Sequence, residues 1–246
     1  MSKTSLKERL KKKKKELKDR TSVGGVIYQK EGTLRVRILN TGEDNDFVCE
    51  IIQFYLGPDI KGVFSPATFG KPCAIMEKYE ELKESPDPED KELAKSFSPR
   101  NKYLAPVVVY TDSKGNKVEN DKSGKLIQLS NNQYQEVIDH FLDEDEWGDM
   151  TDPKNGYDIK LTRVGTGQYD TEYSMSPCKN TQAPKGWDKE VNLEEMVNAI
   201  IPTYEDTQDA INKFLSLGDD DEDDERPIRK KKKVSKKKKK SSDLDG

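Results

Sequence analysis

The sequence predicts a mainly β domain with helical insertions, flanked by highly charged terminal segments. Short segments that alternate apolar and polar side chains predict strands, and stretches with helical spacing between them predict inserted helices. Charged residues make up 37% of the 246 residues and hydrophobic residues 32%, so the apolar core is modest. The length accommodates one sizeable domain plus tails.

Charge divides the chain into three parts. Residues 1–20 hold 10 Lys and Arg against 3 Asp and Glu, residues 21–218 hold 22 against 35, and residues 219–246 hold 11 against 9. We therefore expect a basic arm at 1–22, a folded core at 23–218, and a disordered tail in which an acidic run precedes a lysine-rich block. The arm is either a solubilising tail or a segment that docks on an acidic surface or on nucleic acid.

The cysteine and histidine content gives little support for a disulfide framework or a zinc site. Cys49, Cys73 and Cys178 form no CxxC pair, and His140 is the single histidine. The first 18 residues lack the apolar region of a secretory signal, and no run of residues approaches transmembrane length. We therefore expect a soluble, intracellular protein that needs no cofactor and binds no membrane.

The first strands of the core are predicted at residues 33–39 and 47–56. In TLRVRIL, three apolar side chains share one face, and Arg35 and Arg37 share the other. Two arginines on a strand face are usually solvated, but beside aromatic residues they could equally belong to a phosphate-binding groove.

Helices are predicted at residues 72–83, 88–95, 193–201 and 203–217. Prolines begin the first two, and Thr203 with Asp206 resembles a capping pair at the start of the last. The first two helices are rich in glutamate, which indicates a solvated surface away from any polyanion or an electrostatic guide around a groove.

The strongest apolar strand is predicted at residues 103–111, and the chain enters it through Arg100 and Lys102. Pro106 within this segment suggests an edge strand or a bulge, because proline donates no hydrogen bond to a sheet. A polar loop with several lysines follows it.

A further strand is predicted at residues 125–129, followed directly by a helix that ends near Leu142. The helix begins with SNNQ, which has the form of a capping box, and it carries four apolar side chains on one face. His140 lies on this helix without a partner at ligand spacing, so we interpret it as structural or superficial.

The segment DPKNGYDIKLTRVGTGQYDTEYSMSP predicts a β-hairpin with strands at 157–164 and 169–175. Its polar side carries Arg163, Tyr169 and Tyr173. A cation and aromatic rings on a strand surface suit stacking on unpaired bases with a phosphate contact. The alternative is an ordinary hairpin with tyrosines packed at its edge.

The sequence contains no P-loop, GxSxG, HExxH or Cys/His pairing, so catalysis is not expected. Short strands interrupted by a helix, with cations and tyrosines on several strand faces, instead predict a partly open five-stranded Greek-key barrel, the OB-fold. Such barrels bind single strands through a cationic groove and stacked aromatic side chains.

The order of four segments resembles the replication single-stranded-DNA-binding, or helix-destabilising, proteins of tailed phages, over roughly residues 33–217. These segments are RVRILN, RNKYLAPVVVYTD, KLIQLSNNQYQEVIDHF and NGYDIKLTRVGTGQYDTEYSMSP. The resemblance implies sequence-independent coating of single-stranded DNA in replication, recombination and repair, in the cytoplasm of an infected bacterium. It also implies partners: other copies along the strand, and replication and recombination proteins recruited by the tail.

By the same resemblance, the residues that contact the strand are Arg37, Arg100, Lys102, Tyr103 and Tyr169. Some family members carry a zinc module with one His and three Cys, of which only Cys73 remains here, so zinc is expected to be absent. The family's acidic tail usually ends the chain, whereas a lysine-rich block follows it here.

Strand alternation adds further candidates to this set. The complete predicted nucleic-acid-binding set is Arg35, Arg37, Arg100, Lys102, Tyr103, Lys125, Arg163, Tyr169 and Tyr173. Two other functions remain open: an adaptor that recruits partners through its charged tails, and an RNA-binding chaperone that uses the same surface.

Overall fold

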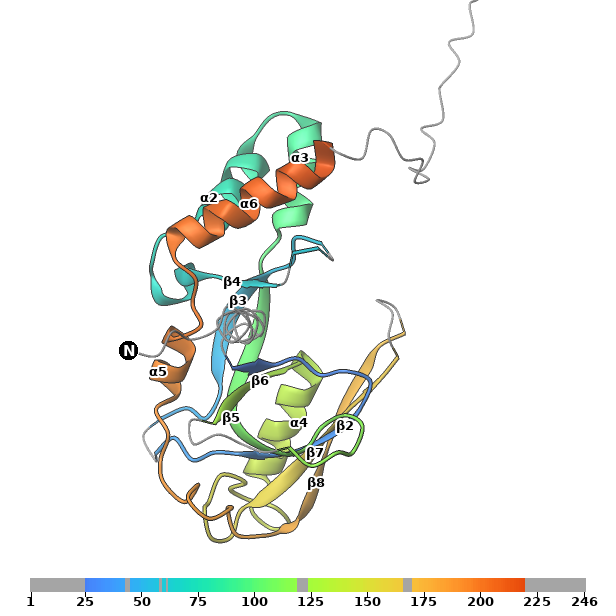
Figure 1. The fold of residues 1–246 in the computed structure, drawn as a ribbon, viewed down its shortest axis with the longest axis vertical. Coiled ribbons are helices and arrows are strands. Elements are labelled where there is room, and N and C mark those ends of the chain that lie inside the picture. Colours follow the sequence, from blue (N-terminus) through green and yellow to red (C-terminus); the bar gives the residue numbers. More distant parts are fainter. Residues whose placement is uncertain are drawn as a thin grey trace, which may run out of the picture.

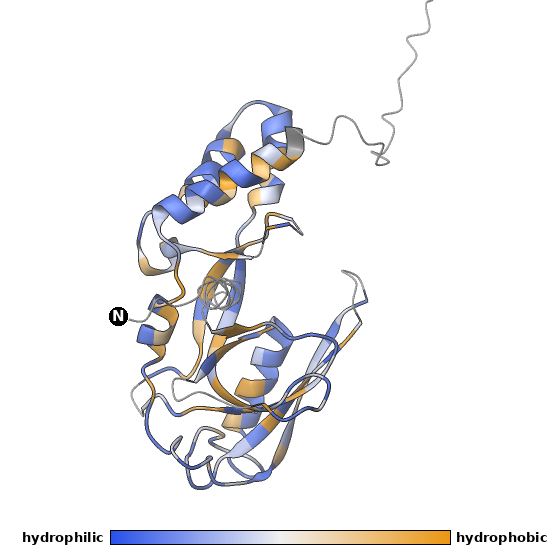
Figure 2. Cartoon of the chain, in the orientation of Figure 1, coloured by the Kyte–Doolittle hydropathy of each residue, from blue (hydrophilic) through white to orange (hydrophobic). Residues whose placement is uncertain are grey.

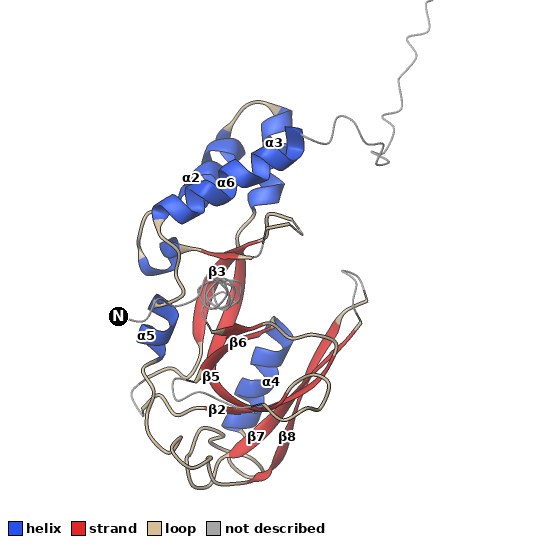
Figure 3. Cartoon of the chain, in the orientation of Figure 1, coloured by secondary structure: helices blue, strands red, loops and turns tan. Residues whose placement is uncertain are grey.

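The computed structural model describes residues 25–42, 45–57, 59–60, 62–118, 124–165 and 170–219. Within them, eight strands form one mixed sheet, and helices lie beside and beyond it (Figures 1 and 3). The strands are β1 (Val26–Ile27), β2 (Gly32–Ile38), β3 (Cys49–Phe54), β4 (Val63–Phe64), β5 (Arg100–Thr111), β6 (Lys125–Leu129), β7 (Tyr157–Val164) and β8 (Glu172–Asn180). The helices are η1 (Pro66–Phe69), α2 (Ala74–Glu84), α3 (Pro88–Ala94), η2 (Lys95–Phe97), α4 (Asn131–Leu142), α5 (Leu193–Asn198) and α6 (Tyr204–Asp219).

Strand β5 is the centre of the sheet. Its first half pairs with β3 and its second half pairs with β2 along the same edge, while β6 pairs with the other edge. Pro106 lies where β3 ends and β2 begins, and its carbonyl accepts a 2.8 Å bond from the Leu39 backbone N–H. In a strand, the N–H and the C=O of one residue point to the same edge of the sheet. The position at which Pro106 lacks an N–H therefore lies where β5 changes its partner from β3 to β2. The prediction from Pro106 that this segment is an edge strand is therefore wrong, because β5 is paired on both sides.

The strand order is β1-β6-β5-β2-β7-β8, with β3 joined to β5 and β4 to β3. Strand β1 is parallel to β6, and the other pairs are antiparallel. Among the described residues no pairing joins β1 to β8, so the sheet is open. The mainly β fold with helical insertions is confirmed, whereas the five-stranded barrel is not.

The predicted hairpin is present, and it extends the sheet beyond β2. Strands β7 and β8 pair over most of their length, and the β7 residues Leu161 and Ile159 are buried. Helix α4 packs against β8 and β5. It begins with the predicted capping box, in which Ser130 and Gln133 each bond the backbone of the other. Val137 of α4 lies fully buried in the main core beneath the sheet.

A separate helical lobe covers the far end of β3 and β5 (Figure 1). Helices α2, α3 and α6 pack around Phe54, Ile75 and Phe97, all of which are fully buried. Thr207 of α6 caps α2 by accepting a 3.1 Å bond from the Ala74 backbone N–H. Figure 2 shows that the lobe is otherwise largely hydrophilic, in keeping with its glutamate-rich sequence.

Local capping signals account for where several helices begin. The backbone N–H and hydroxyl of Thr203 both donate to Asp206 at 2.9 Å, and the Asp206 N–H donates back to the hydroxyl, so this predicted capping pair is confirmed. The basic arm at 1–22 and the tail beyond residue 219 lie outside the described residues. Every helix in the described part is too short or too polar to cross a bilayer.

Candidate nucleic-acid interface

A small groove lies where β5, β6 and the β7–β8 hairpin converge with the loop after β1. Its cavity measures about 160 Å³, and its lining residues are Tyr28, Gln29, Lys102, Gln128, Ser130, Arg163 and Tyr173. Three of these, Lys102, Arg163 and Tyr173, belong to the predicted set. The fold therefore brings two cations and two tyrosines from separate segments to one surface.

Arg163 is held in place on the groove wall by backbone and ring contacts. Its Nη1 donates a 2.8 Å bond to the backbone carbonyl of Gln29, and its guanidinium carbon lies 5.7 Å from the ring centre of Tyr173. Arg163 and Tyr173 are direct cross-strand partners in the hairpin, which explains this proximity. The contact is of cation–π type, and it presents the charge and the ring together.

Arg100 and Lys102 share one face of β5, because alternate residues of a strand point to the same side. Burial lowers the pKa of the Lys102 ammonium, and the neighbouring positive charge of Arg100 lowers it further. Arg100 is exposed and lies two residues before Lys102 on this face, outside the lining of the groove. A phosphate placed between these two side chains would relieve their repulsion.

Tyr28 belongs to the groove but is absent from the predicted set. It follows the two-residue strand β1, and 40% of its surface is exposed. Burial of the rest raises the pKa of its phenol, while a hydrogen bond with Gln53 opposes this shift. A strand of two residues is too short for an alternation pattern, so periodicity gave no signal for Tyr28. An aromatic residue just after an apolar pair was the only available cue.

Tyr103 points to the opposite side of β5 from Lys102. Its ring stacks on Tyr134 of α4 at 4.3 Å between centres, and both rings pack against the main core. Lys125 is half-buried at the start of β6, opposite Val107, and does not line the groove. The structure therefore does not bring Tyr103 or Lys125 together with the groove cations.

Arg35 and Arg37 both bond to Asp158 of β7, whose side chain is buried. Arg35 approaches it at 2.6 Å and Arg37 at 3.5 Å. Arg37 is 1% exposed and also donates to two backbone carbonyl groups, at 2.7 and 3.2 Å. Burial and then the charge of Asp158 raise the pKa of Tyr110, beside Arg35, to about 12. Arg37 thus exposes no surface to a phosphate, and its guanidinium group bonds to buried groups in the core.

Tyr169, the last member of the predicted set, lies outside the described residues, as do the neighbouring residues 166–168 of the hairpin tip.

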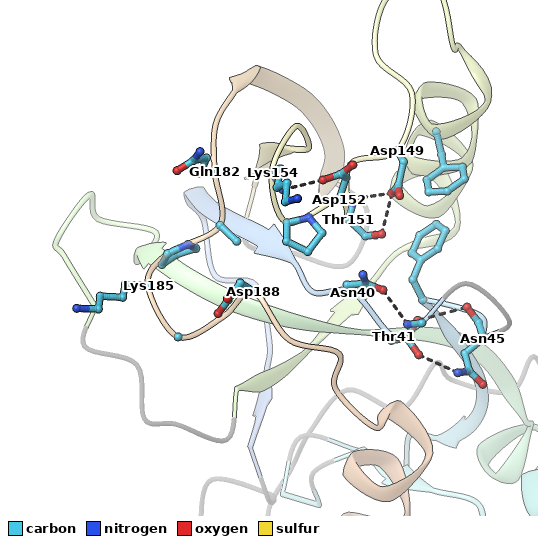
Figure 4. A pocket seen from close by; sticks show the side chains of 17 residues that line it. Asn40, Thr41, Asn45, Asp149, Thr151, Asp152, Lys154, Gln182, Lys185 and Asp188 are labelled. Carbon is cyan, nitrogen blue, oxygen red and sulfur yellow. Dashed lines mark hydrogen bonds between the residues drawn. The ribbon is translucent and has the colours of Figure 1, made fainter.

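A larger cavity, about 930 Å³, lies elsewhere, among three loops (Figure 4). Its carboxylates are engaged in local turns: Asp149 accepts from Thr151, and Asp152 accepts from the backbone of Lys154 and Asn155. These turn bonds, chiefly those from Asn155 and Lys154, lower the pKa of Asp152. The lining holds three aspartates, Asp149, Asp152 and Asp188, against the two lysines Lys154 and Lys185, so it offers a polyanion no net attraction.

Metal binding finds no support in the part of the chain that the structure describes, where no group of three or more His, Cys, Asp or Glu side chains is suitably placed.

Comparison with known proteins agrees with the chemistry of the groove. A search of curated proteins gives no match. The family model described as "gp32 DNA binding protein like" matches residues 30–215, which contain all of the sheet except β1. This match confirms the resemblance to phage single-stranded-DNA-binding proteins that the four sequence segments indicated. The chain belongs to the gp32-like family of DNA-binding proteins.

Proposed function

We propose that this protein coats single-stranded DNA without catalysing a reaction, and that it binds through the groove lined by Lys102, Arg163, Tyr28 and Tyr173. The observation that carries the proposal is the convergence of these side chains from four segments of the chain on one surface. Cations neutralise phosphates, and aromatic rings stack on bases whatever their sequence.

The surrounding surface supports this proposal. Arg100 extends the positive charge along β5, and the glutamate-rich helices α2 and α3 lie in the separate helical lobe beyond the start of that strand. We infer that the open sheet is a variant of the OB-type barrel, because β5 changes its partner along one edge, from β3 to β2.

We further propose that the protein acts in phage DNA replication, recombination and repair, in the cytoplasm of the infected bacterium. Membership of a DNA-binding family supports the DNA-binding part of this proposal. Within this proposal, neighbouring copies associate along the strand, and the tail beyond residue 219 recruits replication and recombination proteins.

The test is a fluorescence titration of the full-length protein with oligo-dT, oligo-rU and duplex DNA at two salt concentrations. Tight binding to oligo-dT that weakens steeply with salt supports the proposal. Preference for oligo-rU would indicate an RNA chaperone, and the absence of binding to all three would indicate an adaptor.

A further inference from the structure

The face of β5 that carries Arg100 and Lys102 continues onto β3. Lys102 is the cross-strand partner of Ile51, and Arg100 is the cross-strand partner of Gln53. Such partners project to the same face of a sheet, so the four side chains share one surface. The Gln53 side chain also hydrogen-bonds with Tyr28, which lines the groove. The surface around Gln53 is therefore continuous with the groove.

Tyr55, which directly follows β3, extends this surface away from the groove. Its neighbours Phe54 and Leu56 are both buried in the core of the helical lobe, whereas Tyr55 is 51% exposed. The alternation of β3 therefore continues past the end of the strand, and Tyr55 projects to the same side as Gln53. At about 3.3 Å per residue, Tyr55 lies roughly 7 Å beyond Gln53 and roughly 13 Å beyond the level of Lys102.

Arg100 and Tyr55 are both free to contact a ligand. Among the described residues, Arg100 forms no ion pair, and the Tyr55 ring contacts no other ring and no cation. A single exposed tyrosine is common on protein surfaces and needs no ligand to explain it. Tyr55 differs because it shares its face with an exposed cation that continues the positive charge of the groove. A cation for the phosphate beside a ring for the base is the combination that binds single strands.

The size of the groove implies that a bound strand continues beyond it. The cavity of about 160 Å³ is well below the roughly 300–1,000 Å³ of sites that bury a whole small ligand, so it accommodates only a short part of a strand. OB-type folds contact about 4–16 nucleotides. Stacked bases rise about 3.4 Å per nucleotide, so the distance from Lys102 to Tyr55 corresponds to about four nucleotides, or fewer where the strand is more extended.

We propose that Tyr55 forms a second base-stacking subsite, which takes an unpaired base of the strand that leaves the groove past Arg100. This inference rests on the proposed function, since the same single strand occupies the groove and the subsite. The subsite stacks on any base, because every base has an aromatic face. The interface then extends from the β7–β8 hairpin, across β5, to the end of β3.

The first test measures the affinity of the full-length protein for oligo-dT in a series of lengths from about four to sixteen nucleotides. Tyr55→Ala should bind the shortest oligonucleotides as the wild type does, because these fill only the groove. It should bind the longer ones about tenfold more weakly, as expected for the loss of one stacked base. Tyr55→Phe keeps the ring and should bind the longer ones within about twofold of the wild type.

Tyr204→Ala is the matched control, because Tyr204 is a similarly exposed tyrosine, on α6 of the helical lobe. It should bind as the wild type does at every length. Equal affinity of Tyr55→Ala and the wild type at every length overturns the subsite but leaves the proposed function intact. A loss that is as large on the shortest oligonucleotides also overturns it, because Tyr55 then acts on the groove itself. No binding by the wild type overturns the proposed function.

The second test locates the base by photo-crosslinking. The shortest oligo-dT that binds with full affinity carries one 5-iodouracil, which couples to an adjacent aromatic side chain on irradiation, and its position is moved along the strand. A base near one end should crosslink to the peptide that contains Tyr55, and a base near the other end to the peptide that contains Tyr173. Crosslinks to Tyr173 with none to Tyr55 from any position overturn the proposal.

Discussion

The side-chain amides of Gln29 and Gln133 donate to each other, at 2.8 and 2.9 Å, although 104 residues separate them in the sequence. Gln29 also donates to the backbone carbonyl of Gln128 in β6, and Gln133 donates to that of Ser174 in β8. This buried pair therefore ties together the loop after β1, the start of α4 and two strands. It fixes the spacing between the walls of the groove.

Replacing Gln133 by leucine should destabilise the protein by about 1–3 kcal/mol, because the side-chain oxygen of the buried Gln29 loses the hydrogen bond that Gln133 donates to it. Single-strand affinity should fall as well, since the Gln29 carbonyl that holds Arg163 is no longer fixed. Urea unfolding and an oligo-dT titration measure the two effects. Gln135→Leu, exposed on the same helix, is the control. If both variants unfold at the same urea concentration, the amide pair does not support the groove.

Salt dependence separates the two β5 cations, Arg100 and Lys102, from cations that do not contact DNA. Arg100→Ala and Lys102→Ala should each lower the slope of log affinity against log salt by roughly 0.7, the value for one phosphate contact on a single strand. Lys154→Ala, exposed at the distant cavity, should leave the slope unchanged. Slopes that do not differ between the wild type and the β5 variants would show that Arg100 and Lys102 are only solvated.

The tyrosines of the groove should contribute through stacking. Tyr28→Ala and Tyr173→Ala are each expected to weaken binding by about 1–3 kcal/mol, while the phenylalanine variants keep most of the affinity. Tyr103→Ala should instead lower the stability, because its ring packs on Tyr134. Titration together with circular dichroism distinguishes these outcomes. Full affinity in both groove variants would place the bases elsewhere.

Local sequence signals predicted much of the fold. The capping residues of α4 and α6 and the alternation in β2 and β7 all act within a few residues of one another. Such signals fix an element without reference to the rest of the chain. They do not fix which strands pair, and the open eight-stranded sheet therefore differs from the predicted barrel.

The site was harder to predict, because burial of a polar side chain depends on distant residues. Alternation correctly placed Arg35 and Arg37 on the face opposite the apolar side chains of β2. Nothing near them in the sequence indicates that Asp158, 121 residues beyond Arg37, lies between them. Lys102 and Arg163, by contrast, both line the groove, because their strands leave that face open to it.

The lowered pKa of Lys102 predicts a pH dependence of binding. Burial and Arg100 disfavour its charged form in the free protein, whereas a bound phosphate favours that form. Affinity should therefore fall as the pH rises through the lowered pKa of Lys102. This fall should begin below the pH range in which ordinary lysines lose their proton. Lys102→Arg should keep its affinity over the same interval, because arginine remains charged. A wild-type affinity with the same pH dependence as that of Lys102→Arg would contradict a contact between Lys102 and phosphate.

The Asp158 side chain is 1% exposed and forms ion pairs with both Arg35 and Arg37. Asp158→Asn should cost about 3–5 kcal/mol of stability, because it leaves the buried charge of Arg37 without its ion-pair partner. The folded fraction of this variant should bind oligo-dT with an unchanged salt slope, since neither arginine lines the groove. Asp139→Asn, an exposed carboxylate on α4, serves as the control for loss of one negative charge. A reduced salt slope in Asp158→Asn at temperatures where it is fully folded would mean that Arg35 or Arg37 contacts DNA after all.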